Sequence, residues 1–210
     1  VGFATGGPRL TVPARNLQGV LTPNPVPHAL TGEREVRRAL SSPIGAPLLR
    51  EVIHPGEKIA IITSDITRPM PTYTVMPALL DELYAGGARP EDITLVFALG
   101  SHRAQTPEEM RHLAGEQAWA QIRCVDSDPA DVVHLGVTSA GTPVDITRVV
   151  AEADRRICLG NIEYHYFAGY SGGAKAIMPG VSTPSAIQSN HSMMVRESAC
   201  AGNLAATPLR

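Results

Sequence analysis

The sequence has no surplus of positive charge and no long apolar run, and each absence argues against one class of protein. Its 210 residues include 18 Lys and Arg against 20 Asp and Glu, so the formal net charge is −2. A nucleic-acid-binding domain usually presents a basic face, which this balance does not favour. No run of eighteen apolar residues occurs, so we expect no membrane span.

Cysteine is also scarce. Cys124, Cys158 and Cys200 are odd in number, far apart and never spaced as C-x-x-C. A disulfide framework usually uses an even set of cysteines, and structural zinc sites usually use closely spaced pairs. The pattern therefore favours a reducing compartment, and we expect a cytoplasmic protein without a structural zinc site.

Hydrophobic residues make up 43% of the chain, enough for a sizeable core. Short apolar runs rich in β-branched residues alternate with helix-like segments, which is typical of a mostly parallel, doubly wound α/β sheet flanked by helices. The expected strands are 57–65, 92–100, 121–126 and 155–162, and the expected helices are 76–87, 106–115 and 182–194, with a strand leading into a short helix over 142–154.

Several helix ends carry specific signals. Pro77 is expected in the first turn of its helix, and Thr106 with Glu109 forms a capping box. Thr183 is expected to cap the helix that follows it. The first 30 residues are rich in proline and aperiodic, so we expect them to be extended or partly mobile.

Polar residues follow the first two expected strands, where parallel sheets usually collect their chemistry. The stretch "SDITRP" (64–69) contains Asp65, Thr67 and Arg68, and an arginine there can grip a carboxylate through a bidentate fork. A plain turn stabilised by Asp65 is the structural alternative. In "GSHR" (100–103), His102 is either a general acid or base or a hydrogen-bonded loop residue.

Other similar residues have simpler interpretations. "VDITRV" (144–149) repeats Asp-Ile-Thr-Arg without the proline, and we expect Asp145 or Thr147 to cap a helix. Structural roles are also expected for four histidines in proline-rich, helical or strand-edge contexts, namely His28, His54, His112 and His134.

The longest motif is "EYHYFAGYSGGAKAIMPG" (163–180). Its glycines precede Lys175, but the pattern is not G-x-x-x-x-G-K-[ST], so nucleotide binding is not favoured. Gly172 and Gly173 allow close backbone approach, and the Lys175 amine is a candidate nucleophile or covalent anchor. His191, in "SNHS" (189–192), is a candidate ligand for a borderline metal.

Taken in order, "SDITRP", "GSHR", the 163–180 motif and "NHS" resemble the N-terminal domain of the nickel-dependent lactate racemase family, from about residue 8 to 210. The resemblance implies a Rossmann-like N-terminal domain of a two-domain enzyme. Residues 1–210 would form the catalytic, cofactor-tethering domain, and the family's C-terminal domain would be absent from this chain. The resemblance also implies an isomerase, in which a 2-hydroxy carboxylate such as lactate is racemised or epimerised by hydride transfer to a nickel pincer cofactor.

The resemblance further implies a role for each matching residue. The cofactor is nickel bound to pyridinium-3,5-bisthiocarboxylic acid mononucleotide, tethered to a lysine that matches Lys175. His191 matches the nickel ligand, and His102 and His165 match the two histidines that transfer protons. Cofactor or substrate binding is implied for the remaining candidates, with the contact of each left open: Asp65, Thr67, Arg68, Gly172 and Gly173.

Two alternatives belong to other functional classes. A domain without the family's second half could keep the fold and bind the cofactor without turnover. A zinc hydrolase built on His102, His165 and His191 lacks any H-E-x-x-H or comparable ligand pair. Cofactor-maturation proteins are expected partners, and a host without them is expected to yield the apo-protein. The substrate and the oligomeric state stay open.

Overall fold

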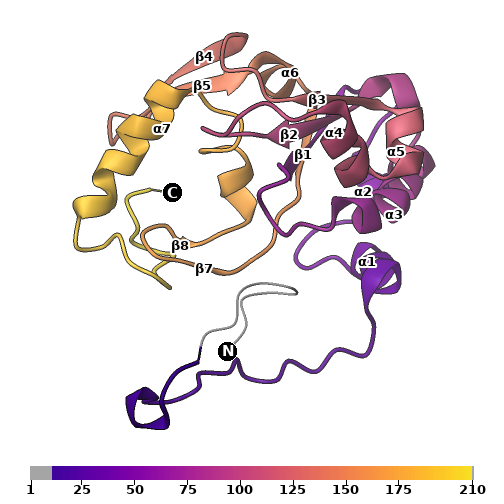
Figure 1. Ribbon diagram of the computed structural model, residues 1–210. Coiled ribbons are helices and arrows are strands. Elements are labelled where there is room, and N and C mark those ends of the chain that lie inside the picture. The colour runs from indigo at the N-terminus through magenta and orange to yellow at the C-terminus, as the bar shows by residue number, and fades with distance from the viewer. Residues whose placement is uncertain (1–10, 210) are drawn as a thin grey trace. The chain divides into compact units, whose positions relative to one another are not determined.

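Four parallel strands form the central sheet of the structure, a computed structural model that describes residues 11–209 (Figure 1). Their order is β3-β2-β1-β6, and the registers align Ile59 of β1 with Ile93 of β2 and Arg155 of β6. The prediction of a mostly parallel α/β sheet is confirmed, and each predicted strand segment contains one of these four strands: β1 (Ile59–Ser64), β2 (Ile93–Ala98), β3 (Arg123–Asp126) and β6 (Arg155–Cys158).

The central strands are apolar on both faces because both faces are covered. Ile59 and Ile61 of β1 belong to one buried cluster, whereas Ala60 and Ile62 between them belong to another, as the alternation of side chains along a strand requires.

One face packs against α3 (Thr72–Ala85), α4 (Pro107–Ala114) and α5 (Glu116–Gln121), with α1 (Gly32–Ser41), α2 (Leu49–Val52) and the short η2 (Pro90–Asp92) nearby. The other face packs against α6 (Arg148–Ala151) and an antiparallel hairpin of β4 (Val132–Val137) and β5 (Pro143–Thr147).

After β6 the chain forms a further small region within the same compact unit. It contains the hairpin of β7 (Tyr164–His165) and β8 (Gly169–Tyr170), then η3 (Gly173–Ala176), α7 (Pro184–His191) and η4 (Ser192–Val195). Phe167, Ala168, Met193 and Leu209 form its apolar centre.

Residues 1–30 and 31–210 are two units by their internal contacts. Between residues 11 and 30 the only regular element is η1 (Ala14–Asn16). No helix within residues 11–209 is long and apolar enough to span a bilayer.

The helix signals are largely confirmed. Thr106 and Glu109 make both bonds of the capping box, and the Thr183 hydroxyl accepts from the N–H of Ala186. Pro77 was misplaced: α3 begins at Thr72, so the proline lies inside the helix. The buried Thr72 hydroxyl is 2.6 Å from that of Thr63, which fixes the start of the helix one turn earlier.

In "VDITRV", Thr147 occupies the N-cap position of α6, but neither Thr147 nor Asp145 caps the helix with its side chain. The Thr147 hydroxyl donates to the carbonyls of Asp128 and Val181 and makes no cap bond. Asp145 instead lies 2.6 Å from His134 Nδ1 across the β4–β5 hairpin, because the two residues are direct cross-strand partners.

Candidate functional site

A cavity of about 330 Å³ opens at the carboxyl ends of β1, β2 and β6. This is where the strand order reverses, since the chain leaves β1 for β2 and later returns to the other side of β1 as β6. In open α/β sheets such a reversal leaves a crevice between neighbouring loops. Six of the predicted site residues line the cavity with ionisable side chains: Asp65, Arg68, His102, His165, Lys175 and His191.

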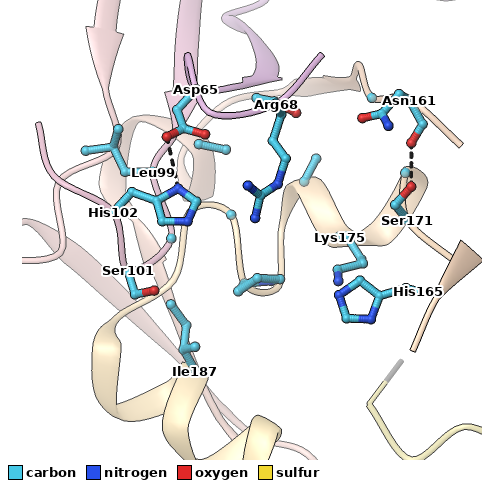
Figure 2. A pocket seen from close by; sticks show the side chains of 18 of the residues that line it. Asp65, Arg68, Leu99, Ser101, His102, Asn161, His165, Ser171, Lys175 and Ile187 are labelled. Carbon is cyan, nitrogen blue, oxygen red and sulfur yellow. Dashed lines mark hydrogen bonds and ion pairs between the residues drawn. The ribbon is translucent and has the colours of Figure 1, made fainter. Parts of the chain in front are cut away.

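Asp65 and His102 are hydrogen-bonded to each other in the cavity (Figure 2). Asp65 follows β1 and is 2% exposed, while His102 comes from the loop after β2. His102 Nδ1 lies 2.9 Å from Asp65 Oδ2. An ionised carboxylate only accepts, so Nδ1 carries the proton and the Nε2 lone pair of the neutral ring is left available.

Thr67 and Arg68 extend this contact. The Thr67 hydroxyl donates to Asp65 Oδ1 at 2.9 Å and accepts from Arg68 NH1 at 3.0 Å. Thr67 is not part of the cavity lining, so it supports the carboxylate from outside. Arg68 does line the cavity, and Figure 2 shows its guanidinium directed into it.

His165 stands in a different environment. Its Nδ1 accepts from the backbone N–H groups of Ala168 (3.2 Å) and Phe167 (3.5 Å), so the neutral ring carries its hydrogen on Nε2. Burial, aided by the positive charge of Lys175, lowers the pKa of His165 to about 4. His165 is therefore neutral at pH 7, and it is the opposite tautomer to His102.

Phe167 connects the remaining site residues. Its ring makes edge contacts with His165 at 4.5 Å and His191 at 5.2 Å between centroids, and Lys175 Nζ lies 5.9 Å from its centre. Burial, followed by the charge of Lys175, lowers the pKa of His191. A neutral imidazole at the end of α7 and an amine on η3 therefore share one wall of the cavity.

The glycines of the 163–180 motif have distinct positions. Gly172 lines the cavity at a φ of 76°, and a Cβ there would lie 3.1 Å from the Asn161 carbonyl. Gly173, at the start of η3, is outside the lining. Gly169 instead lies against the backbone of Asn203, where a Cβ would collide with the Asn203 carbonyl. This glycine therefore lets the C-terminal segment pack closely.

The sequence did not identify Phe167, which lines the cavity, or Gln105 and Asp126, which are hydrogen-bonded to each other outside the lining. Phe167 lies inside the long motif among several other aromatic residues, and Gln105 and Asp126 belong to no motif. Within residues 11–209 no group of three or more His, Cys, Asp or Glu side chains is placed to hold a metal ion by itself.

The fold and the cavity define an α/β protein with a polar site at the strand-order reversal. Residues 3–202 match the family described as "Lactate racemase N-terminal domain", and the chain belongs to that family. Two curated relatives are lactate racemases. The one from Thermoanaerobacterium thermosaccharolyticum is 35% identical over 185 residues (86% of this chain, 43% of the relative). The one from Lactiplantibacillus plantarum is 38% identical over 168 residues (78% and 39%).

Two solved structures are similar to this chain. The lactate racemase apoprotein from Thermoanaerobacterium thermosaccharolyticum superposes with a TM-score of 0.78 at 35% identity, over 84% of this chain and 43% of that one. A Thermotoga maritima protein superposes with a TM-score of 0.67 at 21% identity, over 85% and 45%, which supports the fold alone. The chain thus spans less than half the length of these relatives.

Proposed function

We propose that the protein takes part in the racemisation or epimerisation of a 2-hydroxy carboxylate, lactate or a relative of it. The observation that carries this proposal is the pairing of two imidazoles, His102 and His165, from different loops in one cavity with an arginine and a lysine. Membership of the lactate racemase N-terminal domain family supports it.

The two histidines suit a substrate with two mirror-image forms. A hydroxyl proton must leave when C2 becomes planar, and the two enantiomers present that hydroxyl from different sides. His102 accepts the proton at Nε2, and the buried Asp65 carboxylate stabilises the imidazolium that results. His165 offers Nε2–H as a hydrogen-bond donor in the arrangement seen. To accept a proton at Nε2 it must first release the N–H groups of Phe167 and Ala168 and change tautomer.

Arg68 is the residue we assign to the substrate carboxylate. Its hydrogen bonds to the carbonyl and hydroxyl of Thr67 use one guanidinium nitrogen, NH1. A guanidinium matches a carboxylate in a planar, two-bond geometry that a lysine cannot reproduce. Bound there, the substrate would place its C2 hydroxyl in the same cavity as both imidazoles.

The donor set of the cavity fits the nickel pincer nucleotide. Lys175 would hold the cofactor through a covalent bond to its amine, and the neutral His191 imidazole would ligate the nickel. Gly172 and Gly173 would flank it through their backbone. When bound, the cofactor supplies the hydride acceptor that lets C2 lose its configuration. The protein's own residues bind, orient and exchange the hydroxyl proton.

We further propose that residues 1–210 are the cofactor-tethering part of the enzyme and that the remaining length seen in the relatives contributes the other wall of the site. The cofactor-maturation proteins would be transient partners. Retention of the cofactor without turnover is the alternative function, and the experiment below separates the two.

The test follows the circular dichroism of an L- or D-2-hydroxy acid incubated with protein that was produced together with the maturation proteins. A parallel sample appends the remaining part of the Thermoanaerobacterium relative. The optical signal should decay to zero, and His102→Ala or His165→Ala should each abolish the decay. His134→Ala is the matched control, because His134 also contacts an aspartate but lies outside the cavity.

Retained decay in both cavity variants would remove the two histidines from the mechanism. A protein that carries the cofactor on Lys175 yet leaves every 2-hydroxy acid optically active in both samples would support the binding function instead.

A further inference from the structure

Gln105 holds together the loops that follow three neighbouring strands. It lies between β2 and α4 and is 8% exposed. Its side-chain Oε1 accepts from the backbone N–H of Ile66, after β1, at 2.8 Å. Its Nε2 donates to Asp126 Oδ1, at the end of β3, at 2.9 Å, and its own backbone N–H donates to Asp126 Oδ2 at 2.8 Å.

The direction of each bond is fixed by chemistry. The Ile66 N–H can only donate, and an ionised Asp126 can only accept, so the amide of Gln105 has one possible orientation. Glutamate at position 105 would face the Asp126 carboxylate with like charge, and leucine would leave the Ile66 N–H and the carboxylate without this partner. The position therefore requires a side chain of glutamine's length that both donates and accepts.

The bonds of Gln105 also lie next to the proposed catalytic pair, Asp65 and His102. Ile66 follows Asp65 directly, and Gln105 lies three residues after His102. The Gln105 side chain is thus bonded next to Asp65 and is close in sequence to His102. The contact of 2.9 Å between Asp65 and His102 joins two residues that are 37 positions apart. Neither Gln105 nor Asp126 lines the cavity, so neither touches what binds there.

We propose that Gln105, oriented by Asp126, is a positioning residue that sets the geometry of the Asp65–His102 pair and so keeps His102 in the tautomer with a free Nε2. The inference deepens the proposed function, in which His102 is a proton acceptor, but the tautomer can be measured whether or not that function holds.

The donor and acceptor roles can be exchanged between the two positions. In Gln105→Glu combined with Asp126→Asn, the new glutamate accepts from the Ile66 N–H and from the asparagine amide, and the asparagine oxygen accepts from the backbone N–H of residue 105. Every bond is retained and the total charge is unchanged. Gln105→Glu alone places two acceptors opposite each other, and Asp126→Asn alone places two donors opposite each other.

The experiment measures the His102 ring nitrogens by ¹⁵N NMR in the cofactor-free protein, with His102→Gln for assignment. The native chain and the double variant should show Nδ1–H alone, while Gln105→Glu and Gln105→Leu should show a mixture of tautomers. In matured protein the single variants should lose about ten-fold or more in kcat with KM little changed, and the double variant should recover it. Gln121→Leu is the control, because this glutamine accepts from the Tyr84 hydroxyl and does not line the cavity.

Circular dichroism and urea titration establish that each variant is folded. A folded Gln105→Leu protein with an unchanged His102 tautomer would overturn the inference. So would a double variant that regains stability but not the tautomer. If the His102 tautomers differ among the variants as expected but no sample racemises a 2-hydroxy acid, the result counts against the proposed function. The positioning role of Gln105 would then still stand.

Discussion

The Asp65–His102 contact gives the sharpest prediction about the site. Asp65→Asn keeps the shape of a side chain that is 2% exposed but removes its charge. An asparagine can either accept from His102 Nδ1 through its oxygen or donate to it through its amide. The second arrangement moves the ring hydrogen to Nε2, where it blocks proton acceptance from the cavity.

The expected size of the effect follows from the hydrogen bond that is lost. A bond to a charged group contributes about 1.5–3 kcal/mol, and a central value of ~2 kcal/mol corresponds to a rate change of about 30-fold. In Ser-His-Asp enzymes the same change, which selects the wrong histidine tautomer, lowers kcat by as much as ~10⁴-fold, and this sets the upper limit.

Racemisation measured from the decay of circular dichroism, together with the His102 tautomer from ¹⁵N NMR, provides the assay. Asp145→Asn is the matched control. Asp145 contacts His134 Nδ1 at 2.6 Å in the same manner, and both residues lie outside the cavity. It should leave the rate within about two-fold of the native value, because neither Asp145 nor His134 lines the cavity.

A folded Asp65→Asn protein that racemises at the native rate would refute the reasoning. So would an equal loss in both variants, because the effect would then not belong to the cavity.

Three further predictions follow from the structure. Burial and the charge of Lys175 lower the pKa of His165 from 6.5 to about 4, so the unfolded chain takes up this proton at higher pH than the folded chain. The contribution of His165 to the free energy of unfolding should therefore be fully present above about pH 6.5 and be lost as the pH falls towards 4. His165→Gln should reduce this dependence of stability on pH in urea titrations. Gly180→Ala should destabilise the fold by about 1–3 kcal/mol, since the new Cβ collides with the Ala176 carbonyl, while Gly19→Ala, with no neighbour within 4 Å, should not change the urea midpoint. Arg68→Lys should raise KM for a 2-hydroxy acid by about ten-fold with a small change in kcat, because the two-bond carboxylate contact is lost; an unchanged KM would assign the arginine elsewhere.

Local patterns predicted the centre of the sheet well because β1 and β2 are apolar on both faces. The run around Ile61 is buried from both sides, and such runs are readable from sequence. The β4 strand was missed because Leu135 and Val137 are 60% and 61% exposed, so its apolar residues do not mark a buried face. Pro77 was misplaced because a tertiary contact of Thr72 starts the helix earlier.

For the site too, sequence patterns predicted some features and not others. Motifs at strand ends identified polar residues that the fold gathers into one cavity. Their partners could not be predicted, because Asp65 meets His102 and Gln105 meets Asp126 only through the order of strands in the sheet. The tautomers of His102 and His165 depend on those partners, and so they lie beyond sequence patterns as well.

The most direct test of the central claim is the intact mass of protein produced with the cofactor-maturation proteins, followed by peptide mapping. The chain contains two lysines, Lys58 and Lys175, so the attachment point can be assigned without ambiguity. The account predicts an added mass equal to that of the pincer nucleotide on the Lys175 peptide, retained in Lys58→Arg and lost in Lys175→Arg. An unmodified Lys175 in protein exposed to active maturation proteins, or the same mass on Lys58, would contradict it.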